Sequence, residues 1–212
     1  MHLTNLALFS FLSLTLDLSV AYAAKDADLK PILAKPGKQV VDEKFEGAAL
    51  GKNWSVQKGD WQVKDGAVAG QEKASDMHPG VLTLKEPHRD SMVRISFKLD
   101  GAKFFDLSLN SSKGHLFRAV ITPESITLSK DKDKNDAASK GQQLGKASTK
   151  FEAGQWYTLQ LEARGDKLAL QTDSGVKIEA ANPELNVEKT GYRFVVKGAT
   201  VQIAAVKAWD VE

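Results

Sequence analysis

The sequence predicts an all-β protein built as a sandwich of two antiparallel sheets, for three reasons. Short segments of alternating apolar and polar residues recur from residue 40 to the end of the chain, as expected for strands buried on one side. Turn dipeptides such as Asp100-Gly101 and Gly165-Asp166 separate these segments. No window shows the apolar period of a helix. Regularly spaced short strands with turns between them are typical of a β-sandwich.

The first residues do not fit that pattern. Residues 6–18 are mostly apolar, and Ala21-Tyr22-Ala23 is a small-x-small cleavage site. Together they predict a signal peptide over residues 1–23. The run is shorter than the roughly 20 residues of a membrane-spanning helix, which makes an uncleaved anchor the less favoured alternative. We therefore expect a secreted or periplasmic protein with no membrane association after cleavage.

Residues 24–39 predict a linker, because Pro31 and Pro36 favour extended backbone and the apolar content is low. Residues 40–212 then form one sandwich domain. The chain contains no cysteine, so its stability must come from the core, and about 170 residues can bury enough surface for that. Besides a hairpin at Trp61, we expect strands over residues 40–45, 54–56, 81–85, 92–99, 104–110, 115–122, 125–129, 156–164, 168–172, 176–180, 192–197 and 201–209.

The hairpin at Trp61 is the most informative of these elements. Trp61 and Val63 precede Asp65-Gly66, and Ala67 and Val68 follow it. Asp-Gly tolerates positive φ at the tip of a two-residue turn, so this segment predicts a tight β-hairpin. The alternation places Trp61 and Val63 on the core side.

Alternation also assigns the faces of the other strands. In residues 92–99, Val93, Ile95, Phe97 and Leu99 share one face, whereas Arg94, Ser96 and Lys98 share the other. Residues 157–164 alternate in the same way. Because successive side chains on a strand take opposite faces, we expect sheets with one buried and one wet face.

Residues 104–110 and 115–121 predict a second hairpin, whose register the charges help to fix. A two-residue loop would place Arg118 in the core opposite Leu107, and an unpaired buried arginine is costly. A three-residue loop closed by Gly114 places Asp106 opposite Arg118 on the outer face instead. The predicted ligand patch on this face is Asp106, Ser108, Asn110 and Arg118, with His115 at the hairpin end. The alternative is an exposed cross-strand ion pair without a ligand.

Four motifs together resemble a known family. They are the W-x-V-x-D-G pattern of residues 61–66, Gly154-Gln155-Trp156, Gly165-Asp166, and a last strand ending near Trp209. In order and spacing they resemble the 3-keto-disaccharide hydrolase or family 16 glycosidase-like domains. The resemblance implies a concanavalin A-like jelly-roll sandwich over residues 40–212, and a carbohydrate as partner.

Catalytic and metal motifs were not found. The glycosidase pattern E-x-D-x-x-E is absent, and no catalytic residue is assigned. His78, His88 and His115 have no metal-ligand spacing. Residues 131–136 imitate half of an EF-hand loop but have Asp136 where glycine is required. We therefore expect no metal and no cofactor.

The remaining features bear on partners. The net charge is +2, and the basic residues are interspersed with acidic ones, so a nucleic-acid partner is not expected. We expect a monomer. The four tryptophans are candidate platforms for sugar rings, although a strand tryptophan is more often part of the core. They are Trp54, Trp61, Trp156 and Trp209.

The sequence therefore predicts an exported sandwich that holds a glycan on a wet sheet face. Two alternatives stay open. One is a hydrolase of glycosides or 3-keto-disaccharides, as the family resemblance implies. The other is a non-catalytic structural domain of a cell-envelope assembly.

Overall fold

A computed structural model describes residues 26–212, and the predicted signal peptide over residues 1–23 lies outside this part of the chain. The elements are almost all strands, with two single 3-10 turns. The strands are β1 (Pro36–Glu43), β2 (Trp54–Lys58), β3 (Asp60–Lys64), β4 (Ala67–Gln71), β5 (Gly80–His88), β6 (Ser91–Ser111), β7 (Gly114–Thr122), β8 (Ser125–Lys130), β9 (Gln142–Ser148), β10 (Trp156–Arg164), β11 (Lys167–Thr172), β12 (Lys177–Ala181) and β13 (Lys189–Val211). The 3-10 turns are η1 (Ala74–Asp76) and η2 (Pro183–Leu185). None of the described helices is long and apolar enough to cross a bilayer.

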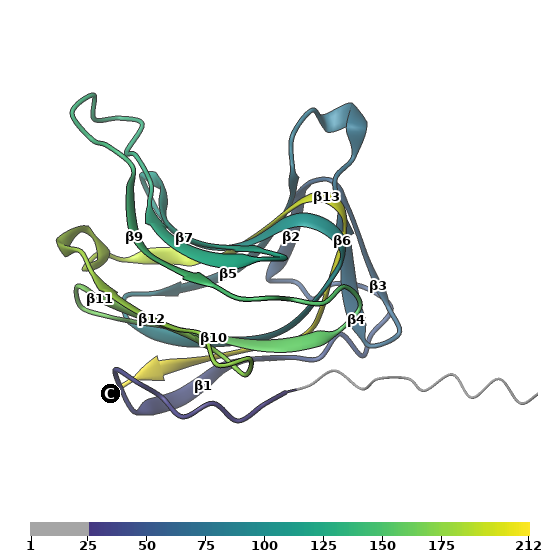
Figure 1. The fold of residues 1–212 in the computed structure, drawn as a ribbon, viewed down its shortest axis with the longest axis horizontal. Coiled ribbons are helices and arrows are strands. Elements are labelled where there is room, and N and C mark those ends of the chain that lie inside the picture. Colours follow the sequence, from purple (N-terminus) through teal and green to yellow (C-terminus); the bar gives the residue numbers. More distant parts are fainter. Residues whose placement is uncertain (1–25) are drawn as a thin grey trace, which may run out of the picture.

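Two long strands, β6 and β13, connect the two layers of the molecule (Figure 1). They pair antiparallel along almost their whole length, and both bend at the same level, where Gly198 lies opposite Ala102 and Thr200 opposite Gly101. Gly101 and Gly198 have φ values of 84° and 91°, which glycine adopts without strain. The bend divides each strand between the two layers. The sequence predicted each of them as two separate strands.

Each layer is built around one half of these strands. The lower layer holds residues 91–99 of β6 and 201–211 of β13, with β10, β11 and β12 on one side and β1, β3 and β4 on the other. The upper layer holds residues 104–111 of β6 and 189–197 of β13, with β7, β8 and β9 on one side and β5 and β2 on the other. All pairings are antiparallel, which confirms the predicted sandwich.

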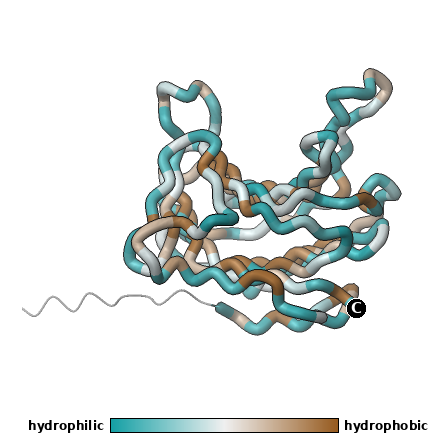
Figure 2. The backbone as a smooth tube through the Cα atoms, turned by 180° about the vertical axis from the view of Figure 1, so that it is seen from behind, coloured by the Kyte–Doolittle hydropathy of each residue, from teal (hydrophilic) through white to brown (hydrophobic). Residues whose placement is uncertain are grey.

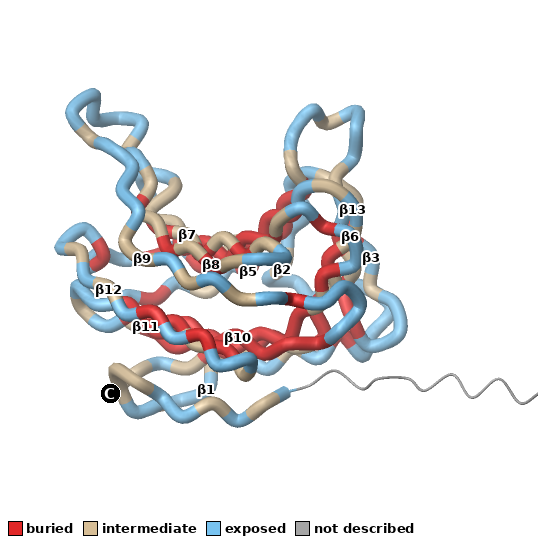
Figure 3. The backbone as a smooth tube through the Cα atoms, in the orientation of Figure 1, coloured by how far each residue is buried: buried red, intermediate tan, exposed pale blue. Residues whose placement is uncertain are grey.

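The core lies between the layers (Figure 3), and apolar residues concentrate there (Figure 2). The predicted apolar face of residues 92–99 is confirmed, because Ile95, Phe97 and their apolar neighbours on β6 are at most 2% exposed. The predicted wet face is wrong for this layer, because Arg94 and Ser96 are buried as well. The ring of Phe97 lies 5.7 Å from that of Phe105 in the upper layer, and Phe105 stacks on Phe194 at 6.3 Å. Aromatic contacts thus tie the two sheets together.

The hairpin at Trp61 is also confirmed. Strands β3 and β4 pair across Asp65-Gly66, whose φ values of 53° and 73° are those of a type I′ turn. Trp61 is 7% exposed, and its indole nitrogen donates to the carbonyl of Lys58 at 3.0 Å. Its ring fills the space above Gly70, where an added Cβ would come within 2.2 Å of it.

The segment predicted as a linker, by contrast, packs on the sandwich. Residues 26–35 run over the outer side of the lower layer, and β1 begins at Pro36 rather than at residue 40. The backbone amides of Ile32 and Leu33 donate to the carboxylate of Glu162 at 2.7–3.0 Å. Arg94, predicted on a wet face, is buried and donates to the carbonyl of Leu29 at 2.8 Å. The polar side chains of this face bind backbone groups from the segment, which holds it there.

Candidate functional site

The outer side of the upper layer is the candidate site, and we call it the open face. Two loops, residues 72–79 and 131–141, project from the molecule on this side, one at each end of the layer (Figure 1). The open face is defined here by the polar side chains that alternate with core residues on four strands. They are Thr83 and Lys85 of β5, Asp106, Ser108 and Asn110 of β6, His115 and Arg118 of β7, and Arg193 and Lys197 of β13.

The structure corrects the register predicted for the β6–β7 hairpin. Ser111 pairs with Gly114, so the turn has two residues rather than three. A β-bulge at Leu116 then shifts the pairing, and Arg118 lies opposite Ser108 instead of Asp106. The bulge adds one residue to β7 and thereby returns Arg118 to the outer side. The predicted face of each residue is right, although the predicted pairs are wrong.

Asp106 lies at the bottom of the cluster. Asp106 is 1% exposed. Its Oδ1 accepts a hydrogen bond from Ser108 Oγ at 2.7 Å, and its Oδ2 lies 3.6 Å from Arg118 Nη1. Burial raises the pKa of Asp106 to about 6, although the Ser108 hydrogen bond and the charge of Arg118 act in the opposite direction. Ser108 is also 1% exposed. Both residues therefore support the face from below and do not form its surface.

Arg118 lies above Asp106 and is fixed from a second direction. Its Nε donates to Asp131 Oδ2 at 2.9 Å, and its Nη2 donates to the other oxygen of the same carboxylate. This two-point geometry holds the plane of the guanidinium. The Arg118 side chain remains 32% exposed. Asp131, which begins the incomplete EF-hand pattern of the sequence, is thus an ion-pair partner within the site.

Three further polar side chains meet beside Arg118. Asn110 Oδ1 lies 3.3 Å from Nδ1 of His115, and Nη1 of Arg193 lies 3.5 Å from the same ring nitrogen. Burial, followed by the charge of Arg193, lowers the pKa of His115, which favours the neutral imidazole. Sequence reasoning missed Arg193. Its place between the core residues Tyr192 and Phe194 predicts that it faces outward. That it lies at this site follows only from the pairing of β13 with β6, which the sequence does not specify.

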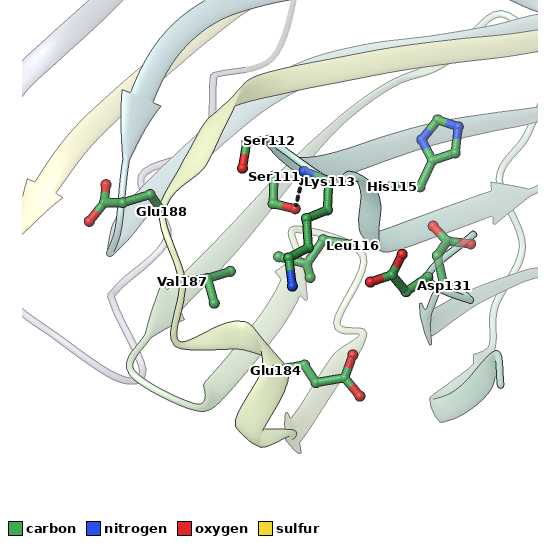
Figure 4. Close-up of a pocket in the computed structure, with 10 residues that line it drawn as sticks. Ser111, Ser112, Lys113, His115, Leu116, Asp131, Glu184, Val187 and Glu188 are labelled. Carbon is green, nitrogen blue, oxygen red and sulfur yellow. Dashed lines mark hydrogen bonds between the residues drawn. The ribbon is translucent and has the colours of Figure 1, made fainter. Parts of the chain in front are cut away.

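Two hollows adjoin these residues. One of about 200 Å³ is lined by Thr83, Lys85, Asn110, Thr190 and Arg193. The other, of about 270 Å³, lies at the end of the β6–β7 hairpin and is lined by His115 and Lys113 together with the carboxylates of Asp131, Asp133, Glu184 and Glu188. Figure 4 shows the Lys113 side chain pointing into this second pocket, with Glu184 and Glu188 at its margin. The first hollow is basic and the second is mainly acidic.

The three histidines of the described chain lie in separate places. His88 is buried and stacks on Tyr192 at 4.7 Å, and His78 lies in the projecting loop with Nδ1 donating to the carbonyl of Pro79 at 2.8 Å. Over residues 26–212, no group of three or more His, Asp or Glu side chains is arranged to hold a metal ion.

The four tryptophans lie away from the open face. Trp61 and Trp156 are buried, and Trp54 packs between the core rings of Phe45 and Phe194 at 5.4 and 5.6 Å. Trp209 lies under the guanidinium of Arg94 at 5.4 Å, on the covered side of the lower layer. The contacts that the open face offers are therefore polar rather than aromatic.

Comparison with known proteins gives the fold. No family model and no curated protein matches the sequence. Among solved structures, carbohydrate-binding module CBM66 from Bacillus subtilis superposes with a TM-score of 0.62 at 14% identity, covering 74% of this chain and 96% of that one. SCLam, a non-specific endo-β-1,3(4)-glucanase of glycoside hydrolase family 16, gives a TM-score of 0.62 at 13% identity, over 84% and 95% of the two chains.

A third match is the exoplasmic/lumenal domain of VIP36 bound to Ca²⁺ and Man3GlcNAc, with a TM-score of 0.55 at 13% identity over 76% and 84% of the chains. These likenesses confirm the predicted concanavalin A-like jelly-roll sandwich. At such identities they show the fold alone. The finer resemblance to 3-keto-disaccharide hydrolases is not confirmed.

Proposed function

We propose that the protein binds carbohydrate on the open face. The observation that carries the proposal is a fixed set of half-exposed polar groups, namely Asn110, His115, Arg118 and Arg193, held over the buried Asp106. Amide, imidazole and guanidinium groups supply donors and acceptors for the hydroxyls of a sugar ring. Their mutual contacts orient them before a ligand arrives, which reduces the cost of ordering them on binding. The similar folds named above include a carbohydrate-binding module and a glucanase.

Binding fits the site better than hydrolysis does. A glycosidase needs two carboxyl groups that flank the scissile bond. The Asp106 side chain is 2% exposed and that of Asp131 is 17% exposed, and both lie close to the same arginine. A substrate could not reach Asp106 without displacing Arg118.

A hydrolase is the second candidate function. The observation in its favour is the pKa of Asp106, raised to about 6 by burial, because a carboxyl group with such a pKa can donate a proton near neutral pH. In this case Arg118 would have to move when substrate binds. A hydrolysis assay on every glycan that binds separates the two functions.

The experiment for the first proposal is a glycan-array screen of the wild type, followed by calorimetry on each hit. Asn110→Ala is the test variant, because it removes a half-exposed amide that makes no contact with the Asp106–Arg118 pair. Gln62→Ala is the matched control, since Gln62 is an exposed amide on β3 in the other layer. Equal losses in both variants would contradict the proposed face. If no glycan binds the wild type, the structural-domain alternative takes precedence.

We also propose that this activity takes place outside the cytoplasm. The proposal rests on the apolar run and the cleavage site before Ala24. N-terminal sequencing of the secreted or periplasmic protein should find a chain that begins at about Ala24. A membrane-bound product that retains residues 1–23 would contradict it.

A further inference from the structure

Arg193 is the residue of the open face whose position is not explained by contacts with the other residues of that face. Within residues 26–212, no carboxylate lies within ion-pair distance of its guanidinium, whose one hydrogen-bond contact is with the His115 ring at 3.5 Å. The side chain is half-buried, and burial lowers its pKa. An arginine carries five N–H donors in a planar fork that matches carboxylate, phosphate or sulfate oxygens. Most of these donors have no protein acceptor here.

Arg118, the other arginine of the open face, shows the contrast. It faces Asp106 on one side and Asp131 on the other, so its charge is already compensated within the protein. Arg193 lies two positions from Val195, which pairs with Asp106 across the strands, but it makes no contact with that carboxylate. Asp106 and Asp131 act on Arg193 only from a distance, so among residues 26–212 Arg193 is the arginine of this face without an ion-pair partner of its own.

The surroundings of Arg193 add to this charge. Lys85 and Arg193 line the same hollow, of about 200 Å³, and none of its other lining residues is acidic. Lys197 follows on the same side of β13 and is exposed. The carboxylates of Asp131, Asp133, Glu184 and Glu188 line the other pocket instead. An anion would thus be attracted to one end of the open face and repelled from the other.

We propose that the glycan bound by this protein is anionic, and that Arg193, assisted by Lys85, receives a carboxylate or sulfate group of the sugar in the basic hollow. This inference rests on the proposed function, since it names the class of glycan for the same face. Asn110 and Thr83 lie beside the hollow and can contact the hydroxyls next to the charged group.

The test compares charged glycans with neutral forms of the same backbone. Oligogalacturonate is measured against its methyl ester, and a sulfated carrageenan oligosaccharide against its desulfated form, with a laminarin oligosaccharide as the neutral reference. We expect at least one anionic glycan to bind about tenfold or more tightly than its neutral form, because a charged hydrogen bond is worth more than a neutral one. The two pairs distinguish carboxylate from sulfate as the group recognised.

Variants of Arg193 test whether this residue is responsible for the preference for charged glycans. Arg193→Gln should abolish the preference for the charged form and reduce the salt dependence of binding, and Arg193→Lys should retain part of both. Lys167→Gln is the control, because it makes the same charge change at an exposed position of β11 in the other layer. Melting curves show whether each variant is folded, and Lys85→Gln replaces Arg193→Gln should the latter unfold.

The outcomes separate the two proposals. If a neutral glycan binds as tightly as its charged form and Arg193→Gln does not alter this, the inference is overturned while carbohydrate binding stands. If neither charged nor neutral glycans bind the wild type, the proposed function fails and the inference fails with it. A preference that Arg193→Gln and Lys167→Gln reduce equally would reflect overall charge and would also overturn the inference.

Discussion

Glu162 and Asp106 are both buried carboxylates on outward sides of the sandwich, but they accept hydrogen bonds from different kinds of groups. Glu162 accepts the backbone amides of Ile32 and Leu33, and also Gln160 Nε2 at 2.9 Å. Asp106 accepts from Ser108 and lies beside Arg118. On the lower layer a segment of the same chain covers the polar face. No described segment does so on the upper layer, where side chains alone surround the carboxylate.

This difference explains which face is left for a ligand. Buried polar groups need partners, and the segment over residues 26–35 supplies them to Arg94 and Glu162. On the open face Asp106 has both a hydrogen-bond donor and an ion-pair partner. Most donors of Arg193, by contrast, have no partner among residues 26–212. Side chains of the same chemical kinds thus hold the chain's own backbone on one layer and remain accessible on the other.

Trp61→Ala should have the largest effect, because it removes a buried ring from the core on which both faces rest. The ring is 7% exposed and packs against Gly70. Truncating a buried tryptophan typically costs about 3–5 kcal/mol, a large part of a domain's stability. We expect poor expression or a much lower Tm in a thermal melt. An unchanged Tm would mean that the hairpin contributes little to the core.

Glu162→Ala should detach the covering segment of the lower layer. Removing this acceptor leaves the amides of Ile32 and Leu33 and part of the Gln160–Arg94 network without a partner, which should cost about 3 kcal/mol of unfolding free energy. Limited proteolysis should then cut within residues 26–35. The control is Glu179→Ala, which removes an exposed carboxylate of β12. Equal resistance of both variants would show that other contacts hold the segment.

The pH dependence of stability should report on the buried carboxylate of the open face. The folded chain binds the Asp106 proton more tightly, with a pKa of about 6, than the unfolded chain does, with a pKa of about 4. This contribution to stability is therefore full below about pH 4, declines between about pH 4 and 6, and is absent above that range. Its size is at most about 3 kcal/mol.

Denaturant unfolding of wild type and Asp106→Asn across that pH range isolates this contribution. Asparagine keeps an acceptor for Ser108 but does not titrate, so the variant should lack the decline between about pH 4 and 6. Parallel curves for the two proteins would show that Asp106 titrates with an ordinary pKa.

Asn110→Ala should have the smallest effect on the fold and a specific effect on binding. Asn110 is half-exposed, and within residues 26–212 the one hydrogen-bond contact of its side chain is with the His115 ring. Loss of a neutral hydrogen bond to a sugar costs about 0.5–1.5 kcal/mol, so we expect glycan affinity to fall several-fold while Tm stays within a few degrees. An unaltered Kd would contradict binding at Asn110 and would indicate a site nearer the projecting loops.

The sequence predicted the faces of most strands because alternation is a local property. It placed Asp106, Ser108, Asn110 and Arg118 on one outer side, and the structure agrees. It did not predict their pairing, because nothing in residues 114–118 marks Leu116 as a bulge. The covering segment was also missed, because its proline content resembles that of a linker and its partner Glu162 lies 130 residues away along the chain. Arg193 reaches the site through strand order, which a single sequence does not specify.

The bend shared by β6 and β13 has a consequence for how the molecule opens. Each strand contributes to both layers, so the amides of one layer cannot separate from their partners without pulling on the same strands in the other. Hydrogen exchange in the centres of β6 and β13 should therefore require complete unfolding, with one free energy of opening shared by both strands. A ligand on the upper layer would then slow exchange in residues 91–99 and 201–209, which belong to the opposite layer.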